Sequence, residues 1–201
     1  MAITTYSELK TAIADFLNRD DLTSAIPTFI SLAEAQIARD VRSWRQERRV
    51  QTTIDERYEA LPSDFIQAER LTLDSGEQLR LISVEDMAKY RANNDAPAKP
   101  RFFALSTDQI EYYPTPTGSE VLDMVYCARV PALSDAAPSN WILDSFPDVY
   151  LYGSLIHSAG YLQEDARSNQ WAQLYGSAVS GINSESYRSK YSGGSLIMRV
   201  K

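Results

Sequence analysis

The hydrophobic period of this sequence changes twice along the chain, and this change is the strongest constraint on its fold. Near both ends apolar residues recur at intervals of three or four, as in amphipathic helices, whereas residues 46–131 alternate with a period near two. Turn residues also recur at short intervals in the middle segment, as in a small antiparallel sheet. We therefore expect an α+β fold in which a β-rich insertion interrupts a four-helix bundle.

Residues 1–45 are predicted to form a helical hairpin. Thr5 and Glu8 have the spacing of a capping box at the start of the first helix. Pro27 lies in the first turn of the second helix, where proline is tolerated. The apolar stripe of the first helix is Tyr6, Leu9, Ile13, Phe16 and Leu17, and that of the second is Ile26, Phe29, Ile30, Ala33, Ile37, Val41 and Trp44.

Residues 46–131 contain six segments with strand composition. They are residues 50–54, 69–73, 78–81, 102–106, 110–113 and 120–130. Turn residues at 74–76 and 107–108 indicate two hairpins. Ser83 is the predicted N-cap of a short helix that runs to about residue 91. Both faces of the last strand are largely apolar, so we expect it to be central in its sheet.

Residues 132–187 are predicted to supply the two C-terminal helices of the bundle. Val149, Tyr152, Leu155, Ile156 and Ala159 form one stripe, and Trp171, Leu174, Tyr175, Ala178, Val179 and Ile182 form the next. Glu164 and Asp165 separate the two helices. From Ser184 the sequence turns polar, and residues 188–201 are predicted to be a flexible hinge followed by a docking tail.

The docking tail combines a Gly193–Gly194 hinge with an apolar, β-prone end. Its apolar residues are Leu196, Ile197, Met198 and Val200. Burial would contribute roughly 1.5–3 kcal/mol per apolar side chain, whereas ordering costs roughly 1.5 kcal/mol per residue, so side chains alone about break even. Backbone pairing by strand addition to a partner would provide the remainder. The alternative is that the tail folds back as an edge strand of its own sheet.

A dense group of arginines surrounds Trp44. It consists of Arg39, Arg42, Arg45, Arg48 and Arg49. Such a group suits a phosphate or an acidic partner. Asp40 and Glu47 lie within it, so a solvated and partly self-paired helix end is an equally open interpretation. Docking on an acidic partner and direct contact with DNA are the other two.

The sequence shows no set of residues for catalysis, a cofactor or a metal. The one histidine, His157, lies in an apolar helical stretch, and the one cysteine, Cys127, lies in the last strand, where both suit packing. No zinc-ligand spacing or phosphate-binding loop occurs. A carboxylate pair for glycan hydrolysis could still assemble from distant acids, since the adjacent pairs 20–21, 85–86 and 164–165 suit helix ends and turns.

Composition limits the partners. The net charge of −7 disfavours general affinity for nucleic acid, because such binding requires many cations. No apolar run is long enough to span a membrane, and the first residues lack the pattern of a secretion signal. We therefore expect a protein made in the cytoplasm that makes no membrane contact.

Several stretches resemble phage head-to-tail adaptor proteins, of the kind found in short-tailed phages. They are residues 2–9, 26–35, 60–65, 129–135, 140–143 and 147–153, together with the Gly-Gly tail. The resemblance covers nearly the whole chain, although no single motif is diagnostic of a chemistry.

The resemblance implies a non-enzymatic virion protein at the head-tail junction. Adaptors of this kind form a dodecameric homo-oligomeric ring below the portal protein, and the ring receives the tail nozzle or tail tube protein. Genomic DNA would pass through the channel without specific binding. The alternatives from other classes are a tail-associated glycan or peptidoglycan hydrolase that uses paired carboxylates, and a DNA-binding accessory module.

Overall fold

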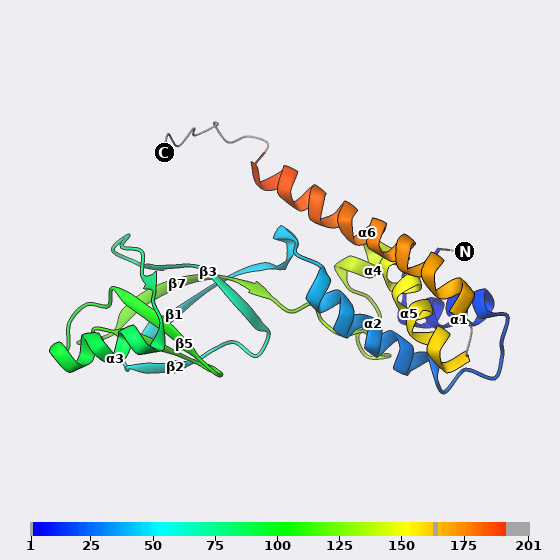
Figure 1. The fold of residues 1–201 in the computed structure, drawn as a ribbon. Helices are drawn as coiled ribbons and strands as arrows, with labels where there is room; N and C mark the ends of the chain where they lie inside the picture. Colours follow the sequence, from blue (N-terminus) through cyan, green and yellow to red (C-terminus); the bar gives the residue numbers. More distant parts are fainter. Residues whose placement is uncertain (1, 163–164, 192–201) are drawn as a thin grey trace, which may run out of the picture. The chain divides into compact units, whose positions relative to one another are not determined.

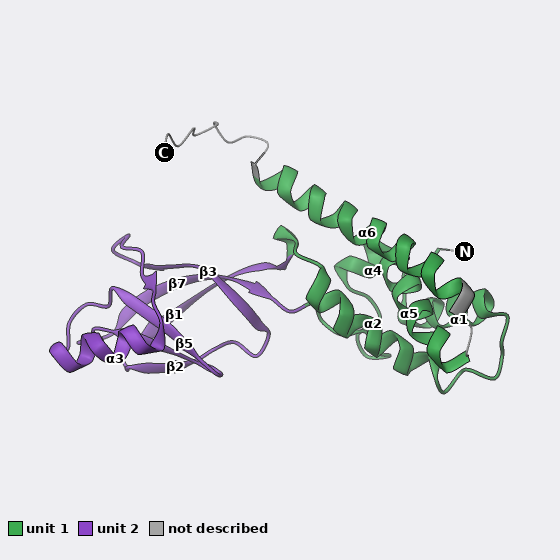
Figure 2. Ribbon diagram, in the orientation of Figure 1, with its two compact units in different colours: residues 1–45, 130–201 green, residues 46–129 purple. Residues whose placement is uncertain are grey.

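The chain is organised as two compact units. The computed structural model describes residues 2–162 and 165–191. One unit, here called the helical unit, comprises Met1–Arg45 and Val130–Lys201, and the other, the β unit, comprises Gln46–Arg129 (Figure 2). Helices and sheets therefore occur in one mixed chain, which confirms the predicted α+β class. The boundaries of the predicted segments within each unit stay predictions.

Among its described residues, the helical unit contains five α-helices. They are α1 (Tyr6–Leu17), α2 (Ile26–Asp40), α4 (Trp141–Ser145), α5 (Pro147–Leu162) and α6 (Asp165–Tyr191), and a 3-10 turn, η1 (Trp44–Gln46), follows α2 (Figure 1). The predicted capping box begins α1, because the Glu8 amide donates to Thr5 Oγ1 at 3.3 Å and the Thr5 amide donates to Glu8 Oε2 at 3.0 Å. Pro27 lies in the first turn of α2, as the sequence predicts.

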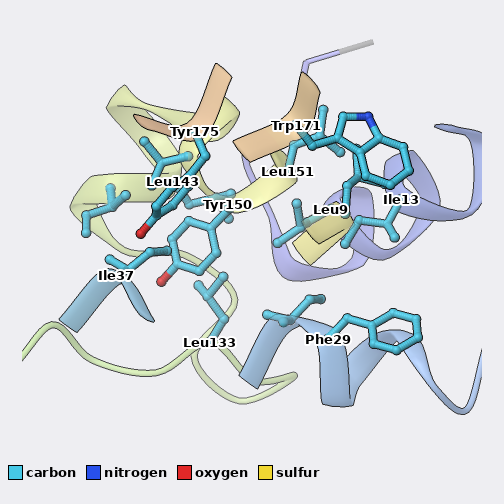
Figure 3. Close-up of a cluster of buried hydrophobic side chains, with 14 of the residues drawn as sticks. Leu9, Ile13, Phe29, Ile37, Leu133, Leu143, Tyr150, Leu151, Trp171 and Tyr175 are labelled. Carbon is cyan, nitrogen blue, oxygen red and sulfur yellow. The ribbon is translucent and has the colours of Figure 1, made fainter. Parts of the chain in front are cut away.

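Helix α5 packs against α1, α2, α4 and α6. Their apolar side chains form one buried cluster, part of which is drawn in Figure 3. Leu9 and Ile13 of α1, Leu143 of α4 and Leu155 of α5 are fully buried there. Short α4 belongs to this core as well, and the more specific arrangement as a four-helix bundle stays a prediction.

Three details of the predicted helices are wrong. Phe16 lies at the margin of the α1 stripe and is 52% exposed. Trp44 does not belong to the α2 stripe, because α2 ends at Asp40 where Val41 becomes extended. Helix α6 continues to Tyr191, past residue 187 where the predicted hinge begins, and Ser186 on its inner face is buried. The tail residues from Gly193 to Val200 lie outside the described residues.

The β unit has seven strands in two sheets. They are β1 (Glu47–Ile54), β2 (Tyr58–Ala60), β3 (Phe65–Leu73), β4 (Arg80–Leu81), β5 (Phe102–Ser106), β6 (Gln109–Tyr113) and β7 (Glu120–Ala128). The first sheet has the order β1-β7-β3, so β7 is central as predicted, and the second has the order β2-β6-β5-β4. Strand β2 was not predicted.

The turns of the β unit agree only in part with the prediction. Residues 107–108 join β5 and β6 in a hairpin, as expected. The chain also turns at residues 74–76, where Gly76 takes a φ of 84°, a value that glycine adopts readily. The segment after that turn pairs briefly with β3, through the antiparallel Thr72–Gln78 bridge and through backbone bonds from Leu73 to Glu77 and from Leu79 to Leu71, and β4 then pairs with β5 in parallel. The insertion is therefore antiparallel except at this pair.

Apolar side chains from both sheets fill the space between them. Leu71, Leu73 and Leu122 of the first sheet share this core with Phe103, Ile110 and Tyr112 of the second. The helix α3 (Val84–Asn93) begins at the predicted cap, Ser83, whose Oγ accepts from the Asp86 amide. Its Met87 is buried against Ala104 and Tyr113, and the ring of its Tyr90 stacks on Phe102 at 5.2 Å.

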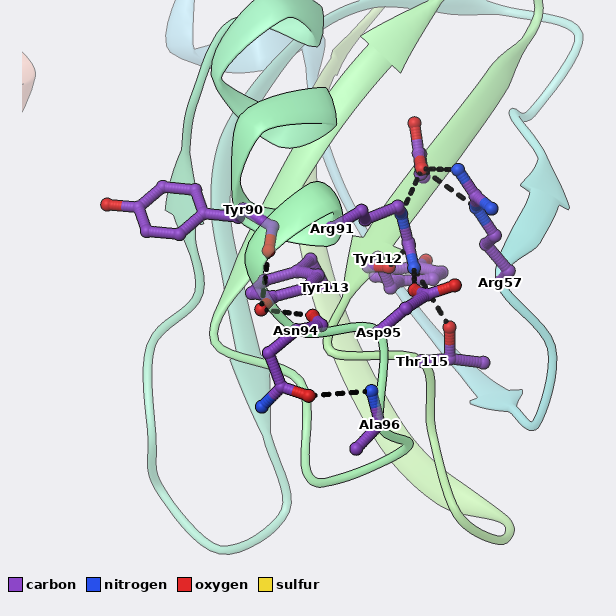
Figure 4. A network of polar contacts seen from close by, with 10 residues as sticks. Arg57, Tyr90, Arg91, Asn94, Asp95, Ala96, Tyr112, Tyr113 and Thr115 are labelled. Carbon is purple, nitrogen blue, oxygen red and sulfur yellow. Dashed lines mark hydrogen bonds and ion pairs between the residues drawn. The ribbon is translucent and has the colours of Figure 1, made fainter.

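A buried ion cluster fastens α3 to β6. Arg91 Nε and Arg57 Nε donate to the same oxygen, Glu111 Oε1, at 2.7 and 2.8 Å, and the side chains of Arg91 and Glu111 are 8% and 7% exposed. The other Arg91 nitrogens donate to Asp95, Thr115 and the Tyr112 carbonyl (Figure 4). All of these groups have partners, which is the condition under which a buried charge is tolerated.

We predict that Glu111→Ala destabilises the β unit by roughly 3–5 kcal/mol, because it leaves two guanidinium groups without their shared acceptor. Chemical denaturation of the full chain measures the change in the free energy of unfolding. Hydrogen exchange of the β5 and β6 amides shows whether the loss of stability lies in the β unit. Glu69→Ala is the matched control, since Glu69 is exposed on β3. Equal stability of the two variants would contradict this role of Glu111.

We predict that Gly153→Val destabilises the helical unit by roughly 1–3 kcal/mol through overpacking. A Cβ at Gly153 would lie 3.2 Å from Ala33 Cβ and 3.4 Å from the Tyr175 ring, so α5 approaches α2 and α6 closely at this point. Gly160→Val on the same helix is the control, because a Cβ there meets nothing within 4 Å. Thermal unfolding of the two variants should differ; matching melting temperatures would refute the close-packing argument.

Candidate protein-interaction site

The predicted arginine group is divided between the two units. Arg39 lies in the last turn of α2, and Arg42 and Arg45 follow that helix, all in the helical unit. Arg48 and Arg49 are neighbours on β1, in the β unit, and their side chains therefore point to opposite faces of the strand. The group is thus not a single helical face.

The segment after α2 is held by polar side chains of α6. Asn183 Oδ1 accepts from the Arg42 amide at 2.8 Å, and Asn183 Nδ2 donates to the Asp40 carbonyl at 3.1 Å. The Trp44 amide donates to Ser186 Oγ at 2.9 Å. Asn183 and Ser186 therefore satisfy the Asp40 carbonyl, which the end of α2 leaves without a partner in the helix, and two amides of the segment that follows. Of these two residues, Ser186 lies in the stretch that resembled a hinge in the sequence.

Arg45 lies within a group of aromatic rings. Its guanidinium carbon is 5.7 Å from the Trp44 ring centre and 5.8 Å from those of Trp141 and Phe146. The same side chain donates to Ser145 Oγ and pairs with Glu185 Oε1 at 3.4 Å. Arg45 therefore joins the chain after α2 to α4 and α6, and only 32% of its side chain is exposed.

The two arginines of β1 form ion pairs on opposite faces of the sheet. Arg48 pairs with Asp64 at 2.9 Å, and Tyr126 donates its hydroxyl to the same carboxylate. Arg49 forms a fork with Asp123, with Nε 2.8 Å from Oδ1, and this hydrogen bonding lowers the pKa of Asp123. Arg39 is exposed and, within the described residues, makes no hydrogen bond or ion pair.

Four of the five arginines thus contact groups of their own chain, whether carboxylates or the backbone carbonyls that Arg42 binds. This pattern is the one expected for the self-paired interpretation. It leaves fewer cations for a partner than the sequence suggests. Docking of this segment on an acidic partner, and its contact with DNA, stay predictions.

The residues with catalytic potential are divided between the two units. His157 lies on α5, where burial and then the charge of Arg39 lower the pKa of its imidazole. Cys127 is buried in β7. Asp21 pairs with Arg19, and Asp86 pairs with Lys89. Among the described residues, no three His, Cys, Asp or Glu side chains cluster as a metal site requires.

A groove that the sequence did not reveal lies in the β unit, and we call it the seam groove. On one side of the unit the two sheets are joined, because the Leu79 amide donates to the Leu71 carbonyl and β4 pairs with β5. On the other side the edge strands β1 and β2 are not paired with each other. The groove there is lined by Val50, Thr52, Glu59, Ala60, Leu61, Pro62, Ile110, Tyr112 and Met124.

The seam groove is small and mostly apolar, with one carboxylate at its edge. Its volume is about 200 Å3. Glu59 accepts from Thr52 Oγ1 at 2.9 Å and from the Tyr112 hydroxyl at 3.3 Å. Burial and the Glu59 charge raise the pKa of Tyr112, so its hydroxyl stays a donor to Glu59. The sequence did not predict this groove for two reasons. The groove lies where strands β1 and β2 fail to pair, and β2 is too short to be recognised from the sequence.

Within the described ranges, no helix is both long and apolar enough to cross a membrane.

We predict that Asn183→Ala loosens the chain after α2, because two backbone groups lose their partner. Loss of such a bond costs roughly 1–3 kcal/mol. Hydrogen exchange at the Arg42 and Trp44 amides should accelerate, whereas Ser184→Ala, an exposed neighbour, should leave both unchanged. Unchanged exchange in Asn183→Ala would show that α6 does not hold this segment.

The comparison with known proteins gives a match over almost the whole chain. The sequence model of one family, SU10 adaptor protein, matches residues 4–199, and this range includes both the helical unit and the β unit. The search of curated proteins gives no significant match. The family match confirms the resemblance to phage head-to-tail adaptors that the sequence suggests. The chain therefore belongs to the SU10 adaptor protein family.

Proposed function

We propose that this chain forms a ring between the portal protein and the tail nozzle or tail tube protein of a tailed phage, around the DNA channel. The observation that carries the proposal is the family match over residues 4–199, which spans both units. Adaptors that the chain resembles form dodecamers, and we propose the same number here. The chain acts by contact with other proteins and performs no catalysis.

In this proposal the helical unit is the rigid body of each subunit. Its helices α1, α2, α5 and α6 share one apolar core and act as a four-helix bundle. Hydrophobic side chains remain on the surface as contact points for neighbours, in keeping with the aromatic enrichment of interfaces. On the helical unit, Phe16 is 52% and Tyr161 is 65% exposed.

Net charge supports passage of DNA without binding. Each chain carries a net charge of −7, so a ring of many copies is strongly negative. A negative wall repels the phosphate backbone at the short distances of a channel. DNA would then move through the ring during ejection without specific contacts.

The docking tail is proposed to clasp the portal or an adjacent subunit. Its composition supports this role, because four apolar residues follow a glycine hinge. Helix α6 is described as far as Tyr191, and Gly193 follows two residues later in the sequence.

We predict that deletion of residues 192–201 strongly reduces incorporation of the chain into phage particles, because the clasp is lost. Quantitative mass spectrometry of purified particles measures incorporation relative to the capsid protein. The control replaces Ser192 and Ser195 by alanine and keeps the apolar end. Undiminished incorporation of the deleted chain would reject the proposed role of the tail.

A further inference from the structure

We propose that the seam groove of the β unit is the acceptor for residues 196–201 of a neighbouring copy of the chain. The inference rests on the proposed function, because it is the proposed ring that brings copies of the chain next to one another. It goes further by naming the site that the tail binds and by choosing the adjacent subunit over the portal.

The shape of the groove fits an inserted side chain. Its volume of about 200 Å3 is below the roughly 300–1,000 Å3 of small-molecule pockets. Ile110, Tyr112 and Met124 contribute apolar surface to the lining, and Val50 remains 36% exposed beside it. The space therefore suits one or two aliphatic side chains of a protein segment.

The strands beside the groove can pair with an extended segment. Strands β1 and β2 are each the edge of their sheet. An edge strand presents backbone donors and acceptors on one side, and peptides bind such edges by adding a strand. This is the backbone pairing that the tail needs, since burial of its side chains only about balances the cost of ordering it.

The alternation of the tail matches the two environments of the groove. In an extended chain, Leu196, Met198 and Val200 point to one face, and Ile197, Arg199 and Lys201 point to the other. The first set is apolar throughout and fits the groove. The second set carries two cations and would face its rim.

The rim of the groove is acidic. Asp55 and Glu56 are exposed in the turn between β1 and β2, and they line a second hollow that shares Glu59 and Ala60 with the groove. Neither Asp55 nor Glu56 forms an ion pair with another described residue. Opposite charges on the rim and on the tail favour this docking and set its direction.

A neighbouring copy is the occupant that a ring requires. A contact between two different surfaces of identical subunits repeats around an axis and closes when the rotation allows. The tail and the seam groove are two such surfaces, and each subunit carries one of each. Every copy would therefore both give and receive a tail.

The test cross-links two populations of the full-length chain in which Cys127→Ala removes the native thiol. One population carries Met198→Cys and the other Ala60→Cys, and the two differ in mass through a tag. After mixing at high protein concentration and oxidation, we expect a heterodimer that joins residue 198 to residue 60. Thr53→Cys, exposed on β1, replaces Ala60→Cys in the control and should give about tenfold less product.

Charge exchange then tests the direction of docking. Arg199→Glu with Lys201→Glu should reduce the heterodimer about tenfold, and Asp55→Lys with Glu56→Lys in the acceptor should restore it. Loss of product without restoration would overturn the proposed role of the acidic rim. Circular dichroism checks that each variant is folded.

Two outcomes would overturn the inference. Absence of the heterodimer is one. The other is a chain carrying both Met198→Cys and Ala60→Cys that cross-links only within itself, which would show that the tail occupies its own groove. The cross-linking assay contains no portal protein, so neither of these results decides whether the chain forms a ring in phage particles. Conversely, a cross-link between residues 198 and 60 would stand even if particles contained no ring of this chain.

Discussion

Burial of α5 on several sides is the constraint on which the helical unit depends. This helix contacts α1, α2, α4 and α6, and Gly153 allows the close approach of α2 and α6. Because α1 and α2 come before the insertion and α4 to α6 come after it, the packing of α5 joins the two ends of the sequence. The β unit can then be inserted between them without interrupting the helical core.

Buried polar contacts complete this core. The Tyr150 hydroxyl accepts from Asn140 Nδ2 at 2.8 Å, and Asn140 Oδ1 caps the first turn of α4. Glu34 of α2 accepts from the Leu133 amide at 2.6 Å, while burial raises the pKa of its carboxyl. These contacts fasten the chain that returns from the β unit to α2 and α5.

The sequence predicts the parts of the fold that depend on local patterns. The capping box at Thr5, the cap at Ser83, the hairpin at residues 107–108 and the central position of β7 are all confirmed. The end of α6 was placed too early, because polar residues such as Ser186 resemble a hinge until their partners after α2 are known. The parallel β4–β5 pair also depends on distant residues.

The candidate sites show the same division. The arginine group is obvious in sequence, yet partners such as Asp64, Asp123 and Glu185 lie far away along the chain and become known only in three dimensions. The seam groove leaves no sequence signal, because it arises where two edge strands fail to pair. The docking tail is read from composition alone.

In the proposed function, this protein is held between other proteins at the head-tail junction. Electron cryomicroscopy of intact particles is the decisive measurement. We expect a ring of copies of this chain between the portal and the tail, with both units of each copy fitted in the map. A junction fully occupied by other proteins, with no density that fits either unit, would contradict it.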